Sequence, residues 1–269
     1  MFDDRPIGIF DSGIGGLTVA AALKSLLPNE SLCYLGDTAR VPYGNKSADV
    51  IQSYAHHCAR FLTHKDVKLI VVACNTASAY ALTHLRKNFD LPIVGVVHAG
   101  AELAIKTSST KKIGVIGTRG TVQSQRYTQV LHELDPSSDC KAIACPLLVP
   151  LAEEGMVSHA LTETLLREYL HGFANYPMDT LILGCTHYPL FEQNITDLVG
   201  DKVQVINSAQ AVAKNVMTTL SKRHLMSENK QSPEHAFFVT DSAEEFARVG
   251  QHFFGQPLEN IMHVDLQIS

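Results

Sequence analysis

Short runs of aliphatic and β-branched residues alternate with longer amphipathic stretches along all 269 residues of the chain. This rhythm is typical of parallel sheets covered by helices and therefore predicts an α/β fold. The expected strands are Ile7–Phe10, Leu32–Leu35, Leu69–Ala73, Ile93–Val97, Ile113–Ile116, Ala142–Ala144, Leu181–Leu183, Val203–Ile206 and Ala236–Thr240. The expected helices include Leu17–Leu27, Val50–His64, Ala77–Asn88, Ser124–Leu134 and Ser158–Phe173.

The two halves of this pattern look like diverged copies of one unit. Ile7–Ser12 resembles Ile113–Thr118 at an offset of 106 residues, and Val41–Tyr43 resembles Val149–Leu151 at an offset of 108. The shared order predicts two similar lobes related by pseudo-symmetry, each a mainly parallel sheet flanked by helices. Clefts between lobes are favoured ligand sites, so we expect the active site there. We assign residues 1–97 and 209–269 to one lobe and residues 98–208 to the other.

A cysteine stands at the end of one expected strand in each lobe. Cys74 directly follows Leu69–Ala73, and Cys185 follows Leu181–Leu183 and a glycine, 111 residues further along. Open α/β sheets build their active sites at the carboxyl ends of strands. Two thiols at matched strand ends suit the removal of a proton from one face of a carbon and its return to the other. A thiol with a pKa of about 8.5 requires support as a base, which we expect from the helix after each strand.

Composition excludes several classes of function. The net charge of −5 offers no basic face for nucleic acid. No apolar run reaches the roughly 18 residues of a membrane span, and Asp3 and Asp4 stand where a secretory signal would be basic. We therefore expect a cytoplasmic protein whose six cysteines are free thiols. Cys140 and Cys145 have no second pair, so no metal site is expected.

A glycine-rich turn follows the first expected strand. Asp11 and Ser12 are placed at the strand end, and the turn Gly13–Gly16 can hold an anion on its backbone N–H groups. The alternative is a turn that only packs a helix onto the sheet. The dinucleotide fingerprint requires glycine at position 18, where the chain has Thr18. A nucleotide-dependent oxidoreductase is therefore disfavoured.

Other polar residues are candidates for binding. The loop Gly36–Gly44 can present backbone donors and the Tyr43 hydroxyl to a ligand, or it is a surface connection in which Asp37 caps a local turn. Glu153 can reach the cleft, or it serves only the helix macrodipole. His187 can shuttle a proton. The residues beside the cysteines that can hydrogen-bond a carboxylate are Asn75, Thr76 and Thr186.

Four motifs together resemble the bacterial glutamate racemases. They are Asp11-Ser12-Gly13-x-Gly15-Gly16-Leu17, Gly36-Asp37-Thr38-Ala39-Arg40-x-Pro42-Tyr43-Gly44, Cys74-Asn75-Thr76-Ala77 and Gly184-Cys185-Thr186-His187-Tyr188-Pro189. In this order they are highly specific, and supporting segments run nearly end to end. The resemblance implies a cofactor-independent enzyme that interconverts L- and D-glutamate with two bases. It also implies that the D-glutamate supplies peptidoglycan synthesis in the cytoplasm.

The resemblance also implies residue roles. Cys74 would deprotonate D-glutamate with the assistance of Asp11, and Cys185 would deprotonate L-glutamate with the assistance of His187. The residues implied to hold the amino acid are Asp11, Ser12, Asp37, Pro42, Tyr43, Gly44, Asn75, Thr76, Glu153, Thr186 and His187. No metal or cofactor is implied, and a homodimer is allowed.

One segment departs from the family, and other functions remain open. The chain has His98-Ala99-Gly100 where many members have an acidic residue and then Pro-Gly, near the expected lobe crossover. The nearest rival function is racemisation of aspartate or another amino acid. A different class is a non-catalytic amino-acid binding protein with the same cleft, which would not require paired thiols.

Overall fold

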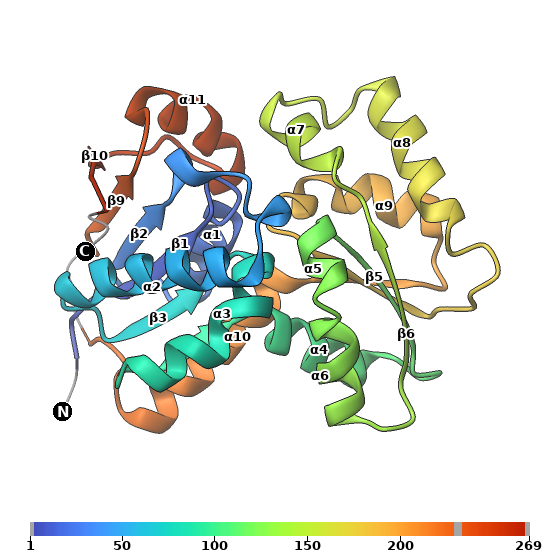
Figure 1. Cartoon of the computed structure of the whole chain (residues 1–269), viewed down its shortest axis with the longest axis horizontal. Coiled ribbons are helices and arrows are strands. Elements are labelled where there is room, and N and C mark those ends of the chain that lie inside the picture. Colours follow the sequence, from blue (N-terminus) through green and yellow to red (C-terminus); the bar gives the residue numbers. More distant parts are fainter. Residues whose placement is uncertain (1–2, 229–232, 267–269) are drawn as a thin grey trace.

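Two parallel β-sheets form the framework of the molecule, each covered by helices (Figure 1). The computed structural model describes residues 3–228 and 233–266. The first sheet contains β1 (Ile7–Asp11), β2 (Leu32–Gly36), β3 (Leu69–Val72), β4 (Ile93–Gly95), β9 (His235–Val239) and β10 (Ile261–His263). The second contains β5 (Lys112–Gly117), β6 (Asp139–Ala144), β7 (Thr180–Gly184) and β8 (Gln204–Asn207). Their spatial orders are β10-β9-β2-β1-β3-β4 and β6-β5-β7-β8, with every one of these pairs parallel.

Helices separate almost all of the strands along the chain. Those that accompany the strands of the first sheet are α1 (Leu17–Leu26), α2 (Ala48–His64), α3 (Asn75–Asn88) and α11 (Ala243–Phe254), and the two that join the sheets are α4 (Val96–Thr107) and α10 (Ser208–Arg223). Those of the second lobe are α5 (Arg119–Gln123), α6 (Arg126–Leu134), α7 (Leu148–Glu153), α8 (Ala160–His171) and α9 (Glu192–Val199). Short 3₁₀ turns occur at η1 (Thr38–Arg40), η2 (Tyr43–Asn45) and η3 (Tyr188–Phe191).

The centre of the first sheet is apolar on both faces. In β1, Ile7 pairs with Leu32 of β2 on one side and with Leu69 of β3 on the other. Every residue of these three strands is buried. Continuous burial of this kind is what parallel strands require when helices cover both faces of their sheet. The predicted α/β fold with two similar lobes is confirmed.

The chain crosses between the lobes twice. It leaves the first sheet after β4 through α4 and returns after β8 through α10, and these two helices pack against each other. The predicted boundary at 97/98 falls inside α4, and the boundary at 208/209 falls at the start of α10. The division itself stays a prediction. The first and last described strands, β1 and β10, both belong to the first sheet (Figure 1).

Three local expectations differ from the structure. The strand expected over Ile93–Val97 ends at Gly95, and the helix α4 starts at Val96, because a continuous apolar run carries no period that separates strand from helix. The helix expected over Ser124–Leu134 is broken at Gln125, whose φ of 53° is left-handed. Strand β10 was not expected. No helix in the described part of the chain is long and apolar enough to cross a bilayer.

Candidate active site

A cavity of about 340 Å³ lies between the two lobes, at the carboxyl ends of β1 and β3 on one side and of β5 and β7 on the other. The first lobe lines it with Ser12, Gly13, Val41, Pro42, Tyr43, Gly44, Asn45, Cys74, Asn75 and Thr76. The second lobe lines it with Thr118, Arg119, Pro146, Val149, Pro150, Glu153, Cys185, Thr186 and His187. All the residues predicted to form the site except Asp11 and Asp37 belong to this lining.

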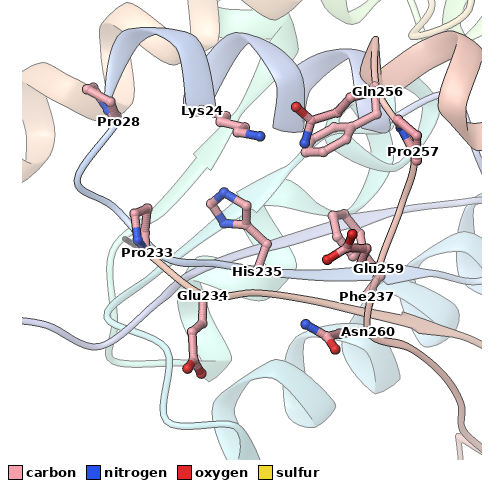
Figure 2. A pocket seen from close by; sticks show the side chains of 11 residues that line it. Lys24, Pro28, Pro233, Glu234, His235, Phe237, Gln256, Pro257, Glu259 and Asn260 are labelled. Atoms are coloured by element: carbon pink, nitrogen blue, oxygen red, sulfur yellow. The ribbon is translucent and has the colours of Figure 1, made fainter. Parts of the chain in front are cut away.

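A larger hollow of about 790 Å³ lies on the outer side of the first lobe (Figure 2). It is lined by the end of α1, by β9 and by the segment between α11 and β10. Figure 2 shows Lys24 and His235 among its polar side chains. Its lining shares no residue with the cavity between the lobes and includes no cysteine. Chemistry rather than volume therefore identifies the candidate site.

Cys74 occupies the N-cap of α3, directly after β3. Its Sγ accepts a hydrogen bond from the Ala77 N–H at 3.4 Å. Burial, together with the charge of Asp11, nevertheless raises the pKa of Cys74 to about 12, against the lowering effect of the hydrogen bonds from Ala77 and Ser12. Cys74 is therefore a thiol at neutral pH, ready to give a proton.

Cys185 is supported differently. The turn η3 begins three residues after it, so no helix N-terminus caps this thiol, and the expected helical support is wrong here. Instead, the Nδ1 atom of His187 lies 3.8 Å from its Sγ, and the Nε2 atom of His187 lies 2.9 Å from Oε1 of Glu153. Burial lowers the pKa of His187, but the bonds to Cys185 and Glu153 outweigh this effect and raise it to about 10. An imidazolium thus faces Cys185 at neutral pH.

The glycine-rich turn after β1 lets the lobes approach each other. A Cβ atom on Gly15 would lie 2.4 Å from both Nδ1 of His187 and Oγ1 of Thr186. Next to it, the Thr18 hydroxyl donates to the Thr186 carbonyl at 3.0 Å. Gly15 therefore serves packing across the cleft, which favours the packing alternative for this part of the turn. Ser12, at the start of the turn, still lines the cavity.

Asp11 lies behind the wall of the cavity. Its side chain is fully buried, and Oδ2 accepts a hydrogen bond from the Gly13 N–H at 2.9 Å. Oδ1 has no hydrogen-bond partner among residues 3–228 and 233–266. Burial raises the pKa of Asp11, and the charge of His187 lowers it. Because its charge also acts on Cys74, Asp11 couples electrostatically to both thiol sites without lining the cavity.

Asp37 also lies outside the cavity lining. Its buried carboxylate accepts hydrogen bonds from Arg40 Nε at 2.7 and 2.9 Å and from the hydroxyl groups of Tyr43 and Thr240. Tyr43 lines the cavity, so Asp37 holds a cavity residue in place from behind. These partners also occupy the oxygens that a ribose would require, which further disfavours a nucleotide site.

Several lining residues were missed from the sequence. Thr118 is the repeat counterpart of Ser12 at the offset of 106, so the internal repeat contained the signal that identifies it. Its hydroxyl lies 2.9 Å from the Thr76 hydroxyl, which bridges the lobes. Val149 is likewise the repeat counterpart of Val41, which also lines the cavity, whereas Arg119 carried no comparable signal.

The lining provides thiols, an imidazolium and amide or hydroxyl donors. No group of three or more metal-binding side chains occurs in the described residues. The lining, as far as the structure describes it, also contains no lysine, which a pyridoxal-phosphate Schiff base requires. Two thiols and a cluster of donors suit proton transfer at a carbon next to a carboxylate.

The chain is similar to known racemases over nearly its full length. The family model described as Asp/Glu/Hydantoin racemase matches residues 17–216. A glutamate racemase of Geobacter metallireducens is 43% identical over 263 residues, which cover 98% of this chain and 97% of the relative. A glutamate racemase of Bacillus cereus is 39% identical over 98% of each chain.

Solved structures show the same likeness. The glutamate racemase isoform RacE1 of Bacillus anthracis has a TM-score of 0.94 at 40% identity, covering 97% of this chain and 98% of that one. The glutamate racemase of Francisella tularensis in complex with D-glutamate has a TM-score of 0.92 at 38% identity, covering 98% of each. An aspartate racemase of Picrophilus torridus, with a TM-score of 0.57 at 18% identity over 81% of this chain and 94% of that one, shares the fold alone.

Proposed function

Because the chain belongs to the Asp/Glu/hydantoin racemase family, we propose that it interconverts L- and D-glutamate by two-base proton transfer without a cofactor. The observation that carries the proposal is the pair of thiols, Cys74 and Cys185, which line one cavity from matched strand ends of opposite lobes. A binding protein would have no use for this pair. Glutamate is favoured over aspartate because the full-length relatives at about 40% identity are glutamate racemases.

The two cysteines take opposite roles in the conversion of L- to D-glutamate. Cys185, beside the His187 imidazolium, acts as the base and removes the α-proton of L-glutamate. Cys74, whose pKa burial raises, acts as the thiol and delivers its proton to the opposite face of the same carbon. The product is D-glutamate, Cys185 holds the proton taken, and Cys74 is left as the thiolate. The reverse reaction starts from this second state.

Hydrogen-bond donors make the proton removal feasible. The α-proton of an amino acid is weakly acidic, and negative charge gathers on the carboxylate as the proton leaves. We assign carboxylate binding to Asn75, Thr76 and Thr186, which line the cavity beside the two thiols. Enclosure between the lobes excludes water, so the carbanion is reprotonated by Cys74 rather than at random.

The proposal includes a cellular role. The reaction would take place in the cytoplasm and supply D-glutamate for peptidoglycan synthesis, as the family resemblance implies. The homodimer stays a prediction.

Proton exchange in D₂O tests the mechanism. The α-proton signals of L- and D-glutamate are followed by NMR with wild type, Cys74→Ser and Cys185→Ser. Wild type should racemise both enantiomers, and both variants should lose racemisation. Cys74→Ser should retain exchange from L-glutamate alone, and Cys185→Ser from D-glutamate alone. Cys140→Ser is the matched control, because Cys140 is a half-buried thiol of β6 outside the cavity.

Two results would contradict the proposal. If wild type exchanges no proton from glutamate without an added cofactor, the assignment is wrong, and L-aspartate and then ligand binding become the functions to test. If either cysteine variant racemises as fast as Cys140→Ser, the two-base mechanism is wrong even though the substrate is right.

A further inference from the structure

Tyr127 connects the second lobe to the amide of Asn75 in the first. It lies in α6, and its hydroxyl is 2.7 Å from Oδ1 of Asn75, at the start of α3. Both residues are almost fully buried, with 3% and 2% of their surfaces exposed. A Cβ atom on Gly184 would lie 3.1 Å from the ring of Tyr127, so this glycine leaves space for the ring directly before Cys185.

Donor and acceptor counting fixes the orientation of the Asn75 amide. Burial raises the pKa of Tyr127, and the charge of Cys185 raises it further, so the phenol keeps its proton and donates it. Oδ1 of Asn75 is the acceptor. If the amide were turned around, Nδ2 would face the phenol, and the buried O–H would lose this acceptor, which is unfavourable for a buried donor.

The other end of the amide then has a defined task. Nδ2 of Asn75 is buried and has no hydrogen-bond partner in the described part of the protein. Asn75 lines the cavity directly after Cys74. A buried amide N–H without a protein partner is costly unless a ligand accepts from it. A carboxylate is the acceptor that a dicarboxylic amino acid provides.

We propose that Tyr127 is a positioning residue, which orients the Asn75 amide so that Nδ2 donates to a carboxylate of the bound amino acid. This inference rests on the proposed racemase function. Without the tyrosine, the amide rotates between two states, and in one of them Oδ1 repels the substrate carboxylate. The bond also spans the lobes, so donation to the substrate depends on their relative placement.

A double-mutant cycle tests this role. The dissociation constant of D-glutamate, measured by calorimetry, and kcat/KM are determined for wild type, Tyr127→Phe, Asn75→Ala and the double variant. Tyr127→Phe should raise the dissociation constant about tenfold and lower kcat/KM about tenfold. This is the size expected for the loss of one orienting hydrogen bond. In the Asn75→Ala background, the same substitution should change them less than twofold, because the residue through which it acts is gone. A tenfold loss in both backgrounds would mean a merely structural role and would overturn the inference, as would wild-type affinity in Tyr127→Phe.

Asn75→Asp provides a second, isosteric test. With Tyr127 donating to one carboxylate oxygen, the other oxygen would face the substrate carboxylate, and D-glutamate binding should fall at least 100-fold. Retained binding would show that Oδ1 faces the substrate ammonium group, and the inference would be wrong. Tyr188→Phe is the control, since it removes a buried bond of similar length, 2.8 Å to the Cys145 carbonyl, away from Asn75. An inactive wild type would refute the proposed function instead.

Discussion

Neutralising His187 should impair one half of the reaction far more than the other. In His187→Asn, Cys185 loses the imidazolium whose Nδ1 lies 3.8 Å from its Sγ. Two unit charges at that separation attract by about 4 kcal/mol at an effective dielectric constant of about 20. A free energy of this size corresponds to about 10³-fold in the rate of a step that depends on the attraction. Asparagine retains a hydrogen-bond donor of similar reach, so the substitution mainly removes the charge.

The assay must separate the two half-reactions. The equilibrium constant between enantiomers is one, so kcat/KM for racemisation falls equally in both directions and hides any asymmetry. Variants with a single thiol expose it. In the Cys74→Ser background, His187→Asn should lower proton exchange from L-glutamate by about 10³-fold. In the Cys185→Ser background, it should lower exchange from D-glutamate less than about tenfold, because Cys74 is supported by the N-terminus of α3.

Two outcomes would refute this reasoning. Equal losses in the rate of proton exchange from both enantiomers would mean that His187 supports both thiols or that it stabilises the whole cleft. An unchanged rate from L-glutamate would mean that the thiolate of Cys185 does not depend on the imidazolium.

Three further predictions concern pH, stability and salt. The folded-state pKa of His187 is about 10, above its ordinary 6.5. The stability that His187 contributes is therefore fully present below pH 6.5 and is lost as the pH rises through 10. Between pH 6.5 and 10, the Tm of wild type should fall more than the Tm of His187→Asn. Lys68 Nζ lies 2.5 Å from Oε2 of the buried Glu30, so Lys68→Met would leave that carboxylate without its cation. The free energy of unfolding, measured in urea, should fall by about 3–5 kcal/mol. The activity per folded molecule should stay unchanged. Arg119 is an exposed cation on the cavity lining, so Arg119→Gln should lower kcat/KM a few-fold at low ionic strength and by a smaller factor at about 1 M salt, where the Debye length is about 3 Å.

The strands and the strand-end residues could be predicted from the sequence because their signals are local. Each expected strand is a short apolar run, and the polar residue that follows it marks the carboxyl edge of a sheet. The internal repeat then places Cys74 and Cys185 on facing lobes without any knowledge of the packing. The start of α4 could not be predicted, because the apolar run Ile93–Val97 suits a buried strand and a buried helix equally well.

The contacts that organise the site could not be predicted, because their partners are distant in the sequence. Asp37 was expected to touch the amino acid, yet one of its partners, Thr240, lies 203 residues away, and the carboxylate faces its partners rather than the cavity. Tyr127 and Asn75 are 52 residues apart and belong to different lobes. Nothing in the local pattern around α6 distinguishes this tyrosine from a core residue. Tertiary packing alone gives it a hydroxyl partner beside the cavity.

The lobes are similar in fold but differ in how they support their thiols. Cys74 caps a 14-residue helix and has the buried Asp11 carboxyl nearby, whereas Cys185 has no helix and relies on His187 and Glu153. A reaction with an equilibrium constant of one does not require equal bases. It requires only that one thiol releases a proton when the other takes one up. Each lobe can therefore stabilise the transition state with its own set of charges and hydrogen bonds. In the proposed mechanism, Cys74 donates the proton in the conversion of L- to D-glutamate and Cys185 accepts it. This difference is why exchange measured from each enantiomer separately reports more than racemisation does.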